Sequence, residues 1–131
     1  MSEETQRERG ERTWREVMAF DALPATEPYT EFTVDAVFGD LWNRPGISRR
    51  DRRLISLTIC AMSAQSMALA AHVDAALSSG DLSVEELDEW VLQLSFYGGW
   101  PIGSSAYAAV RVAAAHESGD LTTEPPNDQA T

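Results

Sequence analysis

The sequence predicts a single all-α domain of about six helices. Apolar residues recur every three or four positions along most of the chain, and no segment shows the strict alternation that marks a half-buried strand. Glycines, prolines and helix-capping residues divide the chain into segments of helical length. With 131 residues, 44% of them hydrophobic, the chain can bury a core without disulfide bonds. We expect residues 13–118 to form this domain, between a flexible N-terminus (1–12) and a flexible tail (119–131).

The six helices are expected at about residues 10–20, 30–42, 48–63, 66–79, 83–97 and 101–118. Ser48 and Ser83 are suitable N-caps, each with an acidic residue three positions later, and Gly80 suits the position after a helix end. The third helix is apolar over most of its surface, so we expect it to be buried. The sixth is rich in alanine, which favours close helix packing or a subunit interface.

Composition excludes several classes of protein. The net charge of −11 argues against non-specific binding to nucleic acid. The single cysteine, Cys60, permits no internal disulfide bond and fits a reducing compartment. The polar N-terminus does not resemble a secretory signal, and no apolar run is long enough to span a membrane. We therefore expect a cytoplasmic protein that binds neither nucleic acid nor membrane.

One basic patch stands out on this acidic chain. All ten basic residues are arginines, and five of them lie between residues 44 and 53, around the start of the third helix. Positive charge at a helix N-terminus opposes the helix dipole, so arginines there make more sense if they face a carboxylate or phosphate. The alternative is that they pair with acidic groups of this or another subunit. The candidates for anion binding are Arg44, Arg49, Arg50 and Arg52.

His72 is the strongest candidate for chemistry. It lies on an apolar stripe of the fourth helix, where a histidine is either a buried residue with a satisfied hydrogen bond or a site residue that lines a cavity; spacing alone favours the first. Trp42, Tyr97 and Trp100 are the aromatic residues that could wall such a cavity. The other histidine, His116, has no metal-ligand spacing around it, so no metal site is predicted. The sequence also lacks a C-x-x-C pair, a G-x-S-x-G elbow and a phosphate-binding glycine loop.

Five short patterns occur in order along the chain and together resemble a known family. They are W-x-R-P-G from Trp42, R-x-R-x-L from Arg50, H-V-x-x-A-L-x-x-G from His72, E-E-L-x-E from Glu85 and Y-x-G-x-P from Tyr97. This set resembles the carboxymuconolactone decarboxylase family of the alkylhydroperoxidase D-like superfamily, over about residues 10–115. The resemblance implies an all-helical subunit that assembles as a trimer or hexamer, with sites near subunit contacts. It also implies either cofactor-independent decarboxylation of a lactone carboxylate or, in another branch, peroxidase chemistry through C-x-x-C-x-x-x-H.

The resemblance assigns roles position by position. The family histidine falls on His72, which the resemblance makes catalytic. The redox cysteines of the peroxidase branch would fall on Gln65 and Ala68, which excludes that branch. The decarboxylase branch usually has glutamate at the position of Ala68 and often a second histidine at Gln93; its arginine two residues after the histidine is Asp74 here. The scaffold therefore matches, while part of the acid–base set differs.

The first hypothesis is a cofactor-independent lyase or isomerase, decarboxylase-like, that acts on a small carboxylate or lactone, including the case of a diverged biosynthetic enzyme. His72 would be catalytic, no metal or organic cofactor would be needed, and the protein would be a homotrimer or homohexamer. The second hypothesis is a non-catalytic family member that binds a small acid or a partner protein as a helical oligomer. The expected substrate-binding residues are Trp42, Arg44, Arg49, Arg50, Arg52, Tyr97 and Trp100.

Overall fold

The computed structural model describes residues 2–119, and every regular element in that range is helical. The elements are α1 (Gln6–Met18), α2 (Pro28–Phe32), a π-helical segment η1 (Thr33–Phe38), a 3-10 turn η2 (Leu41–Asn43), α3 (Arg49–Met62), α4 (Ser66–Ser78), α5 (Val84–Gly98) and α6 (Trp100–Ser118). The predicted all-α fold with six helices is confirmed. The expected tail, apart from Gly119, lies outside the described residues.

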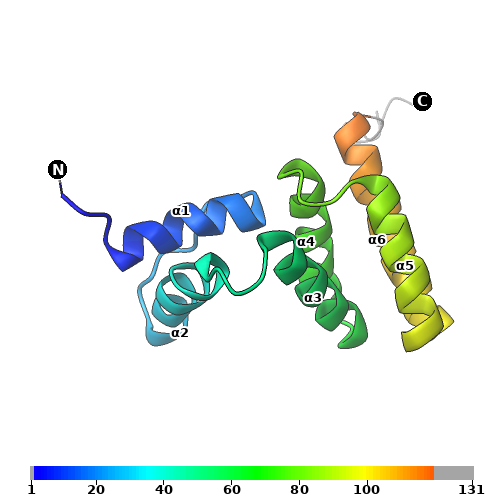
Figure 1. Cartoon of the computed structure of the whole chain (residues 1–131), viewed down its shortest axis with the longest axis horizontal. Coiled ribbons are helices and arrows are strands. Elements are labelled where there is room, and N and C mark those ends of the chain that lie inside the picture. The colour runs from blue at the N-terminus through cyan, green and yellow to red at the C-terminus, as the bar shows by residue number, and fades with distance from the viewer. Residues whose placement is uncertain (1, 120–131) are drawn as a thin grey trace, which may run out of the picture.

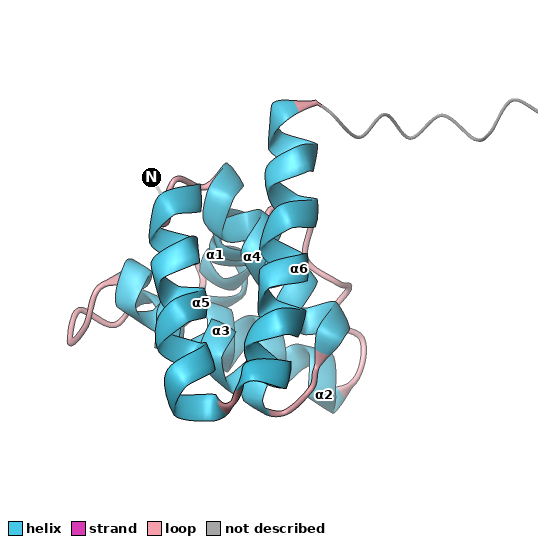
Figure 2. Cartoon of the chain, turned by 90° about the vertical axis from the view of Figure 1, so that its right-hand side faces the viewer, coloured by secondary structure: helices cyan, strands magenta, loops and turns pink. Residues whose placement is uncertain are grey.

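The helices form two groups that meet along α4 (Figure 1). The N-terminal group consists of α1, α2 and η1, and α1 packs against both η1 and α4. The second group consists of α3 to α6, and α5 and α6 lie side by side along its outer face (Figure 2). Each group has its own core. Trp14, Val34 and Phe38 are buried in the first, and Leu57 and Val110 in the second.

Helix α1 begins at Gln6, earlier than the expected start near residue 10. Thr5 and Glu8 form a capping box: the Thr5 hydroxyl accepts from the Glu8 backbone N–H, and the Glu8 carboxylate accepts from the Thr5 N–H. Arg7 then joins the helix to η1 through an ion pair with Asp35, whose Oδ1 lies 2.5 Å from the Arg7 Nε. Residues 6–9, which lie before the expected helix in the segment expected to be flexible, are therefore helical.

The expected second helix is divided into α2, η1 and η2. Two backbone carbonyls near its break are satisfied by side chains: Phe38 O accepts from Asn43 Nδ2 at 2.8 Å, and Gly39 O accepts from Arg9 Nε at 2.7 Å. A Cβ at Gly39 would lie 2.3 Å from the carbonyl oxygen of Asp35, so only glycine fits this close approach. The two donor side chains come from α1 and from the end of η2, and no pattern within residues 30–42 indicated them.

The composition of helix α3 predicts a buried helix, but in the structure only one of its faces is buried. Its inner face packs on α4, and Arg53, Leu57 and Ala61 are buried there. The opposite face is partly exposed among the described residues. That exposed face carries Ile55, Ile59 and Met62.

Helices α5 and α6 approach closely at Gly103. A Cβ at this position would lie 1.7 Å from Ser95 Oγ and 2.7 Å from Ser95 Cβ.

No described helix, including the 19-residue α6, has the combination of length and apolar content needed to cross a bilayer.

Gly103→Ala should lower the free energy of unfolding by about 1–3 kcal/mol, because the added methyl group forces the two helices apart or displaces the Ser95 side chain. Urea unfolding of the variant beside wild type measures this loss. Gly46→Ala is the matched control, since a Cβ there meets nothing within 4 Å. Equal loss in both variants would show that the cost comes from the chemistry of replacing glycine and not from the helix contact.

Candidate active site

His72 lies on α4, where the two helix groups meet, and its side chain is half-buried. Its ring faces the indole of Trp42, with ring centroids 6.2 Å apart and planes inclined by 20°. Trp42 is 7% exposed and stacks in turn on Phe38, at 6.5 Å and 8°. Trp42 belongs to the N-terminal core, and the η2 turn places it against His72. The two residues are distant in sequence.

Arg53 is the second partner of His72, and it is completely buried. Its Nη1 lies 3.0 Å from His72 Nδ1, while its Nε and Nη2 both donate to Asp81 Oδ2 at 3.2 Å. The guanidinium carbon also lies 5.6 Å from the centroid of the Trp42 ring. A guanidinium group has only donors, so Nδ1 of His72 must be the acceptor of this hydrogen bond.

The pKa of His72 is lowered from 6.5 to about 4, first by burial and then by the positive charge of Arg53. Burial also lowers the pKa of Arg53, an effect that the nearby Asp81 carboxylate opposes. Among residues 2–119, no carboxylate forms a hydrogen bond to the His72 ring. Since Nδ1 accepts from Arg53, the neutral ring carries its proton on Nε2.

Acidification should destabilise the fold through His72. Its pKa is about 4 in the folded chain against 6.5 ordinarily, so the unfolded chain binds more protons between these two values. The free energy of unfolding must therefore fall as the pH falls from about 6.5 to 4, by about 1–2 kcal/mol for this partly solvated ring. We expect the free energy of unfolding, measured with urea, to fall less between pH 7 and pH 4.5 in His72→Gln than in wild type. Equal losses would mean that His72 titrates normally.

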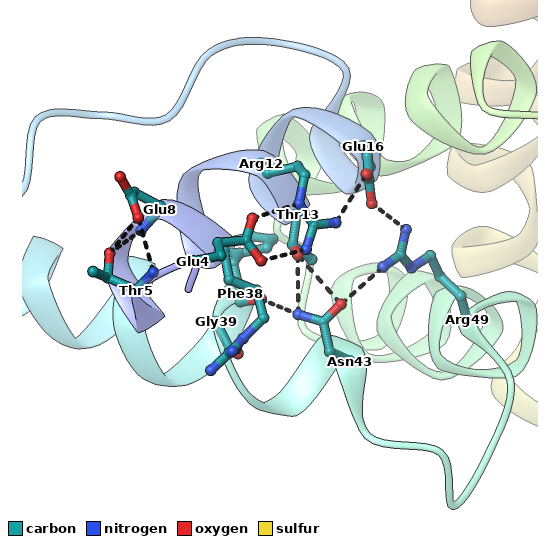
Figure 3. A network of polar contacts seen from close by, with 11 residues as sticks. Glu4, Thr5, Glu8, Arg12, Thr13, Glu16, Phe38, Gly39, Asn43 and Arg49 are labelled. Carbon is teal, nitrogen blue, oxygen red and sulfur yellow. Dashed lines mark hydrogen bonds and ion pairs between the residues drawn. The ribbon is translucent and has the colours of Figure 1, made fainter. Parts of the chain in front are cut away.

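Arg49 and Arg50 are held in ion pairs. Arg49 Nη1 donates to Glu16 Oε2 at 2.7 Å and its Nη2 to Asn43 Oδ1 at 3.2 Å, within a polar network that joins α1 to the start of α3 (Figure 3). Arg50 pairs with Glu86 on α5. For these two residues the structure shows the alternative that we left open, namely pairing with acidic groups of the same chain.

Arg44 lies in the turn before α3, and Arg52 lies in the first turn of that helix, within reach of Arg44. Arg52 Nη2 donates to the carbonyl oxygen of Arg44 at 3.3 Å, and its buried Nε has no hydrogen-bond partner among the described residues. The exposed Arg44 side chain forms no ion pair within residues 2–119. Arg44 and Arg52 are therefore the two predicted cations without a carboxylate partner in the described chain.

Three of the predicted binding residues, Arg49, Tyr97 and Trp100, border three different grooves of the described chain. Arg49 borders a polar groove of about 490 Å³ together with Arg15, Ser78 and Asp81. Tyr97 and Trp100, which are 88% and 61% exposed, border two separate apolar grooves of about 280 and 300 Å³. His72 lines none of these three grooves.

Sequence reasoning did not select Arg53 or Asp81 as site residues. The signal for Arg53 was its position: it lies four residues before Leu57 and eight before Ala61, on the buried stripe of α3. A charged residue on a buried stripe needs a partner, and Asp81 supplies it from the loop after α4. Nothing near Asp81 in the sequence indicates this contact. Within residues 2–119, no group of three or more His, Cys, Asp or Glu side chains has an arrangement suited to a metal ion.

Comparison with known proteins agrees with the all-helical fold and shows the family of this chain. The profile of the carboxymuconolactone decarboxylase family matches residues 27–115. The chain is 28% identical over 80 residues to a 4-carboxymuconolactone decarboxylase of Acinetobacter baylyi, a match that covers 61% of this chain and 59% of the relative. It is 31% identical over 81 residues to a nitrosuccinic acid decarboxylase of Metarhizium robertsii, covering 62% of this chain and 56% of that protein. No solved structure matches significantly. Because the family profile matches more than half of the chain, from α2 into α6, this chain belongs to the carboxymuconolactone decarboxylase family.

Proposed function

We propose that this protein is a cofactor-independent, decarboxylase-like lyase that acts on a small carboxylate or lactone. The observation that carries the proposal is the half-buried, neutral His72, held by the buried Arg53–Asp81 pair beside Trp42. Two relatives named as decarboxylases support it, although this chain spans less than two thirds of the length of each.

The names of the two relatives suggest the chemical class of the substrate. Loss of CO₂ leaves an electron pair on carbon, and a neighbouring electron-withdrawing group must accept it. 4-Carboxymuconolactone carries a lactone, and nitrosuccinic acid carries a nitro group. A substrate of this kind contains its own electron sink, so the protein only has to bind the carboxylate and stabilise the developing charge.

The geometry supports a hydrogen-bonding role for His72. A neutral ring with its proton on Nε2 can donate to the oxygen on which negative charge develops, and solvent can then protonate the carbon. His72 is not proposed as the proton donor to carbon, because with a pKa of about 4 the ring holds no spare proton at neutral pH. Arg44 and Arg52, which lie close in sequence to Trp42 and Arg53, are the proposed carboxylate-binding residues.

The test of the function is CO₂ release from acids that do or do not contain an electron sink. 4-Carboxymuconolactone and nitrosuccinate form the first group, and succinate is the matched control that lacks the nitro group. We expect the full chain, in buffer with a metal chelator and no added cofactor, to release CO₂ from at least one acid of the first group and none from succinate. Release that required an added cofactor would contradict the proposal.

The alternative function is a non-catalytic binder of a small acid or a partner protein. Ala68 and Gln93 favour it, since they replace residues that the resemblance assigns to acid–base chemistry. The same acids decide between the two functions. Saturable binding, seen by calorimetry, of acids that are not turned over would establish the binder.

We also propose that the protein is a homotrimer or homohexamer in the cytoplasm. Ile55, Ile59 and Met62 form an apolar face of α3 on which each side chain is about half exposed, and such faces commonly mark protein interfaces. Light scattering should give three or six times the chain mass of 14.4 kDa. Ile59→Glu should reduce this mass and Ile59→Val should preserve it. A monomeric wild type at micromolar concentration would contradict the assembly.

A further inference from the structure

We infer that Arg53, held by Asp81, is a positioning residue that fixes the tautomer of His72, so that Nδ1 stays unprotonated and Nε2 carries the proton. The tautomer itself follows from the contacts of the chain. The inference rests on the proposed function in one respect only, namely that the Nε2–H group of His72 contacts the substrate.

The guanidinium group of Arg53 has little freedom to turn. Two of its nitrogens, Nε and Nη2, donate to the same carboxylate oxygen of Asp81, and the side chain is completely buried. Nη1 is thereby directed at His72, at 3.0 Å from Nδ1. A proton on Nδ1 would place two donors against each other and leave a buried N–H without an acceptor, which is costly.

The same contact fixes the orientation of the ring. A rotation by 180° about the bond to the ring would place a C–H group where Nδ1 now accepts, and Nη1 would lose its acceptor. Trp42 faces the ring at a centroid distance of 6.2 Å and packs the imidazole in its present plane. Asp74, on the same helix, has His116 as its partner at 3.7 Å. Arg53 is thus the charged group in contact with the His72 ring.

The experiment is ¹⁵N–¹H correlation of the histidine rings in the full chain at neutral pH, with the exposed His116 as an internal reference. In wild type we expect Nδ1 of His72 at the shift of an unprotonated ring nitrogen and Nε2 at that of a protonated one. The double variant Arg53→Met/Asp81→Asn removes both charges and so leaves no lone buried ion. In this double variant the chemical shifts of the His72 ring nitrogens should move toward the average of two exchanging tautomers. Arg111→Gln, which removes an exposed arginine paired with Asp88, should leave them unchanged.

The outcomes separate this inference from the proposed function. A proton on Nδ1 in wild type would overturn the inference, whether or not the double variant folds. Unchanged His72 shifts in a folded double variant would overturn the role of Arg53. If the tautomer behaves as expected and turnover exists, the double variant should lose about tenfold or more in kcat with little change in KM. If the tautomer behaves as expected and wild type turns over none of the acids, the function fails while the inference about Arg53 stands.

Discussion

His72→Ala is expected to lower kcat by about 10²–10³-fold, the usual cost of removing one preorganised hydrogen-bond donor from a developing oxyanion. His72→Gln should retain part of the activity, because its amide N–H can occupy a position close to Nε2–H of the ring. This difference separates the two possible roles of His72. A general acid–base catalyst would lose about 10²–10⁴-fold in both variants, since an amide does not transfer protons.

The measurement is steady-state kinetics with whichever sink-bearing acid the wild type decarboxylates. His116→Ala is the matched control, because His116 is an exposed histidine near the end of α6 whose only described ionic partner is Asp74. It should keep wild-type kcat. Melting temperatures are recorded beside the kinetics. Full turnover in His72→Ala together with a lowered melting temperature would show that His72 is structural, and would withdraw its role in the reaction.

Arg53→Met is expected to lower the free energy of unfolding by about 3 kcal/mol or more. The substitution leaves Asp81 with a side chain only 17% exposed and without its cation, and breaking a buried pair from one side is strongly destabilising. The double variant Arg53→Met/Asp81→Asn should recover most of the loss, because neither buried charge remains. Urea unfolding of wild type, both single variants and the double variant gives the coupling energy directly.

The control for this cycle is the ion pair of Arg111 and Asp88, whose side chains are 41% and 45% exposed. Arg111→Met should change the free energy of unfolding by no more than about 1 kcal/mol, as for most solvated ion pairs. If the losses in free energy of unfolding of the Arg53 and Asp81 single variants add up to the loss in the double variant, the predicted coupling is contradicted. Such additivity would imply that each residue stabilises the fold through other contacts.

The sequence alone determined the helical class and several helix boundaries. Ser48 and Ser83 cap α3 and α5 through hydrogen bonds to the N–H groups of Asp51 and Glu86, and Gly80 follows α4 with a positive φ of 76°. These features were predictable because capping and termination depend on residues within one helical turn. The candidate His72 was predictable in the same way, from a polar residue on an apolar stripe and from its place in the family pattern.

Tertiary structure decided which surfaces are covered and which charges meet. The sequence identified a cluster of arginines, but only packing shows that the buried Arg53 contacts His72 and Asp81, while the exposed Arg50 pairs with Glu86. The split of the second helix and the exposed face of α3 were undetectable for the same reason. Burial and ion pairing depend on elements distant in sequence, whereas hydrophobic periodicity reports only that a face is apolar and not what covers it.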